Sequence, residues 1–113
     1  MAKPKMLSVE TIARDPIKDA EGNEIGTFVD FMIDLEQNCI PYVIVSLKSR
    51  DGYVGIPWGV FTLGEKHSFI LDVDSSTLDS APGFSEEKWP DISTREYEEK
   101  IYKHFGCPLC VKC

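Results

Sequence analysis

The run Ile25-Gly-Thr-Phe-Val-Asp-Phe-Met-Ile-Asp-Leu35 decides the fold class of this chain. Apolar residues recur at every second position along it, which is the period of a β-strand with one buried face. We therefore predict one long strand whose odd-numbered side chains, from Ile25 to Leu35, are buried. A strand of that length in a small domain must bend or coil, as in a small barrel, and Gly26 is a position where it can bend.

Further strands are predicted on both sides of this run. Residues 6–12 also read as β, and the turn residues of 19–23 separate them from the long strand. Ile40 to Leu47 is apolar on both faces and predicts a central strand with Pro41 at its beginning. An Asp-Gly pair at 51–52 predicts a hairpin. Shorter strands are expected at 53–58, 60–63 and 67–73, so the pattern predicts a mostly β protein of five or six short strands, a small antiparallel barrel or a rolled sheet.

The pattern changes after Asp74. One helical turn is expected within 75–81, followed by an ordered loop over 82–92. Ser93 and Glu96 have the spacing of a capping box, so a helix is predicted to begin there. Its apolar residues, spaced by four, are Tyr97, Ile101 and Phe105, and Gly106 ends it. We expect this C-terminal helix to pack on the barrel.

The composition fits a single soluble domain. The chain has 113 residues, with 12 Lys and Arg against 19 Asp and Glu, which gives a net charge of −7. That acidic balance disfavours binding to nucleic-acid phosphates or to an anionic membrane surface. No apolar run approaches the ~20 residues of a membrane-spanning helix, and the N-terminus lacks the apolar region of a signal peptide. We predict a cytoplasmic protein that binds no nucleic acid and inserts into no membrane.

Three stretches in order resemble the PRC-barrel family, in its stand-alone bacterial and archaeal form. They are Gly22-Asn-Glu-Ile-Gly-Thr-Phe-Val-Asp-Phe-Met-Ile-Asp34, Tyr53-Val-Gly-Ile-Pro-Trp58, and Leu78-Asp-Ser-Ala-Pro-Gly-Phe84 followed by Trp89-Pro-Asp91. The resemblance implies a small β-barrel core over 6–81. It leaves an aromatic loop and helix over 82–106, packed on that core, and a cysteine-rich tail over 107–113.

The resemblance also implies a class of function. The family includes the barrel domains of the photosynthetic reaction-centre H subunit and of a ribosome-maturation factor, where the barrel is a docking or supporting module. It offers no catalytic residues that map onto positions of this chain.

The carboxylates of the strands make poor catalytic pairs. Asp30 and Asp34 are about 13 Å apart along an extended strand, more than the roughly 5–9.5 Å of a glycosidase pair. Asp72 and Asp74 are about 7 Å apart but lie beside solvent-facing positions. We predict solvated or turn-capping roles for all four. Neither histidine has a Ser or Cys at a recognised nucleophile spacing, so no catalytic residue is assigned and no enzyme is expected.

Three large aromatic residues, Trp58, Phe84 and Trp89, follow predicted strands. We predict that they seal the ends of the barrel, and an exposed binding patch is the alternative.

The C-terminus carries Cys107, Cys110 and Cys113 as C-x-x-C-x-x-C. Two thiolates at this spacing can reach one tetrahedral Zn²⁺, and the run resembles part of an iron–sulfur ligand set. The fourth ligand could come from His104, from Cys39 or from a second chain. A frayed tail with reduced thiols and adventitious disulfides is the alternative. Cys39 itself is predicted to be a reduced thiol in the core.

The sequence therefore predicts one function and leaves one alternative. The first is a non-enzymatic protein-interaction or assembly-support module without a cofactor, with an unidentified protein partner or a second copy as a homodimer. The alternative is a metal-binding or redox protein that uses Cys107, Cys110 and Cys113 for Zn or an iron–sulfur cluster.

Overall fold

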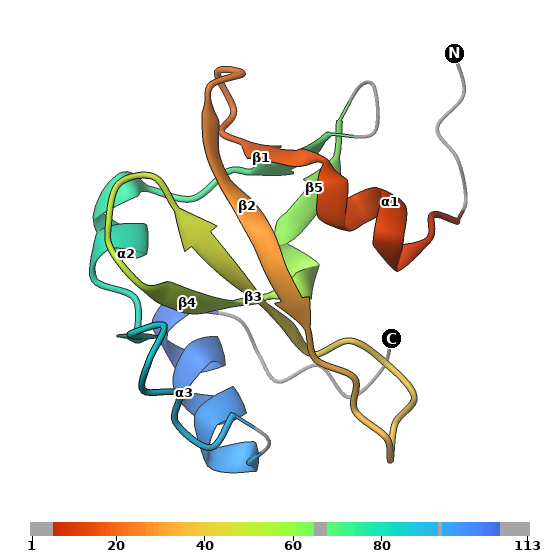
Figure 1. The fold of residues 1–113 in the computed structure, drawn as a ribbon, viewed down its shortest axis with the longest axis vertical. Coiled ribbons are helices and arrows are strands. Elements are labelled where there is room, and N and C mark those ends of the chain that lie inside the picture. Colours follow the sequence, from red (N-terminus) through yellow and green to blue (C-terminus); the bar gives the residue numbers. More distant parts are fainter. Residues whose placement is uncertain (1–5, 65–67, 93, 107–113) are drawn as a thin grey trace.

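The backbone forms one curled sheet of seven strands in the order β5-β6-β1-β2-β3-β4-β7 (Figure 1). The computed structural model describes residues 6–64, 68–92 and 94–106. The strands are β1 (Pro16–Lys18), β2 (Glu24–Phe31), β3 (Tyr42–Leu47), β4 (Tyr53–Pro57), β5 (Phe61–Leu63), β6 (Phe69–Leu71) and β7 (Gly83–Phe84). All pairings are antiparallel except that of β1 with β6. The mostly β fold is confirmed, as a half-barrel of seven strands where five or six were expected.

Three α-helices and one 3-10 turn complete the described chain. They are α1 (Val9–Arg14), the turn η1 (Trp58–Val60), α2 (Ser75–Asp79) and α3 (Arg95–Phe105). The prediction of β structure at 6–12 is wrong, because Ser8 caps a helix there by accepting from the Thr11 amide at 3.1 Å. Among the described residues, none of the helices has the length and apolar character needed to cross a bilayer.

The long strand predicted from Ile25 to Leu35 is shorter, and up to the bulge at Val29 its buried face is the other one. β2 pairs Phe28 with Val45 and then Asp30 with Ile44, so Val29 is an extra residue in a β-bulge. Before the bulge, Gly26 and Phe28 are buried, whereas Val29 is 39 % exposed. The bulge resets the alternation, because one inserted residue moves every later side chain to the other face.

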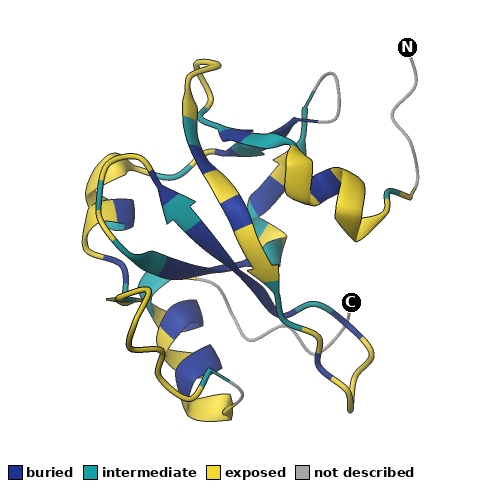
Figure 2. Cartoon of the chain, in the orientation of Figure 1, coloured by how far each residue is buried: buried dark blue, intermediate teal, exposed yellow. Residues whose placement is uncertain are grey.

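β3 is the central strand that its sequence predicted. It lies between β2 and β4, and its alternate side chains are buried on both faces of the sheet (Figure 2). Val43, Val45 and Leu47 enter the core of the half-barrel. Tyr42 and Ile44 point to the opposite face, where they pack against α3. A run that is apolar except for Ser46 therefore suits β3, since both faces of the strand are covered.

α3 packs on this second face through the residues predicted for it. Tyr97 and Ile101 are buried, and Tyr102 adds a third buried ring beside them. The helix is capped by Thr94, whose hydroxyl oxygen accepts from the Tyr97 amide at 3.2 Å. The predicted cap at Ser93 is therefore one residue too early, and Ser93 itself lies outside the described residues. Gly106 ends the helix as predicted, with a left-handed φ of 68°.

Candidate functional site

A hollow of about 300 Å³ lies between the turn that follows β2 and the start of α3. We call it the groove. One wall consists of residues 32–36 with Pro41 and Tyr42, and the other of Ile92, Thr94, Arg95 and Glu98. The two walls lie far apart in the sequence. They meet because α3 packs on the face of the sheet to which Tyr42 and Ile44 point.

An ion-pair network joins the two walls. Arg95 Nη1 donates to Asp34 Oδ2 at 2.6 Å and to Glu98 Oε1 at 2.8 Å. Its Nη2 lies 3.8 Å from Glu36 Oε1. The side chains of Asp34 and Glu98 are only 6 % and 7 % exposed, while that of Arg95 is half exposed. The guanidinium therefore covers two carboxylates and presents its outer edge to solvent.

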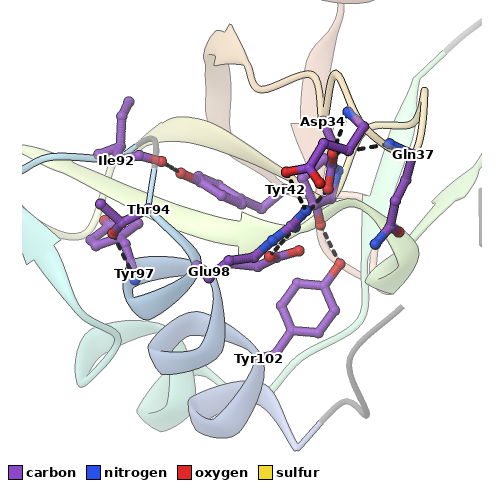
Figure 3. A network of polar contacts seen from close by, with 11 residues as sticks. Asp34, Gln37, Tyr42, Ile92, Thr94, Tyr97, Glu98 and Tyr102 are labelled. Carbon is purple, nitrogen blue, oxygen red and sulfur yellow. Dashed lines mark hydrogen bonds and ion pairs between the residues drawn. The ribbon is translucent and has the colours of Figure 1, made fainter. Parts of the chain in front are cut away.

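Asp34 also organises the turn on its own wall. Its Oδ1 accepts from the amides of Glu36 and Gln37 at 2.9 and 3.1 Å, as Figure 3 shows for Gln37. Its backbone bridges to that of Cys39, and Asn38 adopts a left-handed φ of 56° to close the turn. The hydrogen bond from Arg95 lowers the pKa of Asp34 below its ordinary 3.8, against the effect of burial, and the two turn amides lower it further. Asp34 is therefore a fixed anion at neutral pH.

Two tyrosine hydroxyls form hydrogen bonds that hold the two walls of the groove together. Tyr42 donates its hydroxyl to the Ile92 carbonyl, and Tyr102 donates to the Pro41 carbonyl at 2.5 Å (Figure 3). Burial raises the pKa of Tyr42 well above its ordinary value, so its hydroxyl stays protonated and able to donate. These bonds tie α3 and the segment before it to the start of β3, and they fix the relative position of the two walls.

Two apolar side chains on the rim face water. Ile33 is 61 % exposed and Leu35 is 86 % exposed, while Asp34 between them is buried. The sequence predicted burial for both apolar residues, and that prediction is wrong. They lie beyond the last residue of β2, in the segment that Asp34 holds in place. Scattered exposed apolar residues are ordinary on a protein surface, but here two of them border a charged groove.

The other carboxylates of the sequence analysis do not join this site. Asp30 is exposed, and its Oδ1 accepts from the Phe31 amide at 2.8 Å. Asp72 is exposed, and Asp74 occupies the cap position of α2 without a side-chain hydrogen bond. These roles match the solvated and turn-capping predictions. Of the four, only Asp34 has a cationic partner in the described chain.

The predicted aromatic seals behave differently from one another. Trp58 is partly buried and packs against the half-barrel core, with its ring centroid 5.4 Å from that of Phe69, which favours the seal over an exposed patch. The rings of Phe84 and Trp89 contact each other in a tilted arrangement, with centroids 4.8 Å apart, and both also contact Tyr53. Trp89 remains 41 % exposed, and its ring neighbours Tyr53 and Phe84 pack with the cluster on the α3 face and not with the half-barrel core.

The sequence named three cysteines of the C-terminal tail as candidate metal ligands. Cys107, Cys110 and Cys113 lie outside the described residues, so their metal site stays a prediction. Cys39 is buried, as predicted, but it is disulfide-bonded, so the prediction of a reduced thiol is wrong. His104 Nε2 donates to the Thr77 carbonyl at 2.8 Å and thereby joins α3 to α2. In the described ranges, no three His, Cys, Asp or Glu side chains are grouped to hold a metal.

A comparison with models of protein families identifies the family of this chain. The model of the PRC-barrel domain matches residues 4–78. The protein belongs to the PRC-barrel family. The matched segment contains β1 to β6 and the wall of the groove around Asp34, whereas Arg95 and Glu98 lie beyond it. A search of curated proteins finds no significant relative.

Arg95 and Glu98 line the groove but were not predicted as functional residues from the sequence. One sign was available, because Arg95 is the first residue of α3, where the positive end of the helix dipole disfavours a cation. A cation at that position is stabilised only if carboxylates lie nearby to offset the helix dipole. The sequence supplied many acidic residues, however, and nothing in their spacing marked Asp34, which is 61 residues away.

Proposed function

We propose that this PRC-barrel protein is a non-enzymatic protein-interaction or assembly-support module and that the groove is its docking surface. The observation that carries the proposal is the exposure of Ile33 and Leu35, at 61 % and 86 %, on the rim of a charged hollow. Exposed apolar side chains bordered by polar and charged groups match the apolar centre and polar rim of a protein interface, where burial of apolar area drives association.

The state of the groove's ionised groups supports binding over proton transfer. Arg95 holds Asp34 and Glu98 at 2.6 and 2.8 Å, and it keeps the pKa of Asp34 low. A catalytic acid or base works best with a pKa near the operating pH. Asp34 is shifted in the opposite direction, as expected of a structural anion that shapes a surface.

The rigidity of the walls supports the same role. Asp34 fixes the turn that carries Ile33 and Leu35, and Tyr42 fixes the segment before α3. A preformed surface binds with a smaller entropy cost than one that must become ordered on association.

The test is an affinity purification under reducing conditions with three forms of the protein: wild type, Leu35→Asp and the matched control Val9→Asp. Val9 is 49 % exposed on α1 and is not part of either wall of the groove. Both variants introduce one carboxylate at an exposed apolar position. Circular dichroism first verifies that both are folded.

We expect a partner that is retained by wild type and Val9→Asp and lost by Leu35→Asp, then confirmed by direct binding of the purified pair. Partners held equally by both variants would refute the groove as the docking surface.

A metal-binding or redox role for Cys107, Cys110 and Cys113 is a second proposal, carried by their C-x-x-C-x-x-C spacing alone. Zinc and iron are measured in anaerobically purified protein and in a variant with all three replaced by serine. Metal in the wild type that disappears in the variant supports this role, and metal-free wild type ends it.

A further inference from the structure

The groove has an uncompensated negative charge. Among the described residues, its lining contains three carboxylates, on Asp34, Glu36 and Glu98, and a single guanidinium, on Arg95. The depressed pKa of Asp34 keeps that carboxylate ionised well below neutral pH. One cation cannot neutralise three anions, so the lining retains a formal charge of −2 inside a chain whose net charge is −7.

The surplus charge has a definite position. Asp34 and Glu98 take the two short bonds of Arg95 and are almost completely buried. Glu36 is the outer member, with 87 % of its side chain exposed and only a 3.8 Å contact to Arg95. Its carboxylate can therefore accept a cation from outside without breaking a short hydrogen bond.

Apolar and acidic side chains alternate along this wall. Ile33 and Leu35 project into solvent, and Glu36 follows directly after them. A complementary segment must place an apolar side chain over Ile33 and Leu35 and a cation beside Glu36. From this arrangement we infer that the groove receives a basic segment of another protein, in which Lys or Arg residues flank an apolar residue.

The same charges disfavour other occupants. Two copies of the chain would place like-charged grooves against each other, and like-charge contacts oppose association. Nucleic acid and anionic lipid present phosphates, which the carboxylates of Glu36 and its neighbours repel. A basic protein segment is the occupant whose charge complements the groove.

This inference rests on the proposed function and is tested separately from it. The probes are two synthetic peptides with the same leucines, one alternating Leu and Lys and the other alternating Leu and Glu. Each is titrated into ¹⁵N-labelled full-length protein, and amide shifts are followed. We expect the Leu–Lys peptide to shift the amides of Leu35, Glu36, Gln37 and Arg95, more weakly as salt is raised. We expect the Leu–Glu peptide to leave them unchanged.

Two variants separate a specific site from general attraction to an acidic protein. Glu36→Gln should weaken the Leu–Lys peptide by roughly two- to fivefold, the range of an exposed ion pair. Leu35→Asp makes the groove more acidic but removes its apolar rim. Tighter binding to Leu35→Asp would show that charge alone attracts the peptide, and it would overturn the inference.

Equal binding of the Leu–Glu peptide, shifts confined to residues outside the groove, or a dimer in sedimentation that Leu35→Asp dissociates would overturn it too. Under those results the proposed function still stands if Leu35→Asp loses the captured partner while Val9→Asp keeps it. The proposed function fails instead if Leu35→Asp retains every partner.

Discussion

Gly55→Ala tests the contact that places α3, and with it Arg95, beside the sheet. A β-carbon at position 55 would lie 2.4 Å from Ile101 Cδ1, 3.3 Å from Ile101 Cγ1 and 3.4 Å from Tyr97 Cε2. Ordinary carbon contacts are about 3.5–4.0 Å. Ile101 is completely buried, so its terminal methyl has no solvent to move into and the helix must shift or strain.

The size of the effect follows from two opposing contributions. Overpacking a buried contact costs roughly 1–3 kcal/mol. Replacing glycine in a strand recovers about 0.5–1 kcal/mol, because glycine loses more backbone freedom on folding. We therefore expect Gly55→Ala to lower the free energy of unfolding by about 1–2 kcal/mol, which corresponds to roughly 4–8 °C in Tm for a domain of this size.

A double-mutant cycle identifies the clash. Ile101→Val removes the Cδ1 methyl and alone costs roughly 0.5–1.5 kcal/mol. Combined with Gly55→Ala, it vacates the space that the new methyl needs, so the double variant should be more stable than the sum of the single changes predicts, by about 1 kcal/mol or more. The measurement is urea unfolding followed by circular dichroism and tryptophan fluorescence.

Gly59→Ala is the matched control, because a β-carbon at position 59 meets nothing within 4 Å. Its stability should change by no more than about 0.5 kcal/mol. If Gly55→Ala behaves like Gly59→Ala, or if the cycle shows no coupling, the proposed packing of α3 on β4 is wrong.

Three further predictions concern the groove and its supports. Asp34→Asn should destabilise the protein at pH 7, because the ionised carboxylate is stabilised by Arg95 in the folded state. Arg95 lowers the folded pKa of Asp34 below 3.8, so the stabilisation from this ion pair is present above pH 3.8 and is lost as the pH falls through the folded pKa. Urea unfolding curves of the variant and the wild type should therefore converge in acid. Gly52→Ala should cost roughly 2 kcal/mol or more in urea unfolding, because φ there is +79° and the added carbon would lie 2.5 Å from the Phe84 carbonyl oxygen; an unchanged midpoint contradicts this. Tyr97→Phe should leave stability unchanged or raise it by up to about 1 kcal/mol, because that hydroxyl is buried without a hydrogen-bond partner among the described residues, and an absorbance titration should lose a tyrosine whose pKa is about 12.

The sequence predicts β3 and α3 well because local pattern and tertiary environment agree there. The run from Ile40 to Leu47 is apolar on both faces, and both faces are covered. Tyr97 and Ile101 follow the helical period and are both buried. Gly106 ends α3 with the left-handed φ that glycine favours.

β2 shows why alternation alone can mislead. The odd-numbered residues from Ile25 to Leu35 are apolar, and a regular strand would bury them together. Phe28 takes the core position instead, and its ring lies 5.2 Å from that of Phe31. Both rings reach one cluster only because Val29 is inserted as a bulge. A bulge depends on the partner strand β3, so a single strand's pattern does not reveal it.

The groove was harder to predict than the fold. Ile33 and Leu35 matched the period of a buried face, and their exposure follows from the end of β2 at Phe31. The pairing of Asp34 with Arg95 depends on where α3 lands on the sheet. Long-range ionic contacts of this kind leave no periodic mark in a sequence.

The parallel pair of β1 and β6 has a consequence for how the chain is assembled during translation. β1, β2 and β3 each pair with the next strand along the chain, so the ladder from β1 to β4 can form as soon as Pro57 has left the ribosome. The other edge of β1 stays unpaired until β6 has been synthesised, because Ile17 pairs with Phe69 and Lys18 with Ile70, about 50 residues later. Such distant pairing forms slowly, because a long loop must close first. A nascent chain therefore exposes the edge of its first strand until the hairpin of β5 and β6 arrives and closes it.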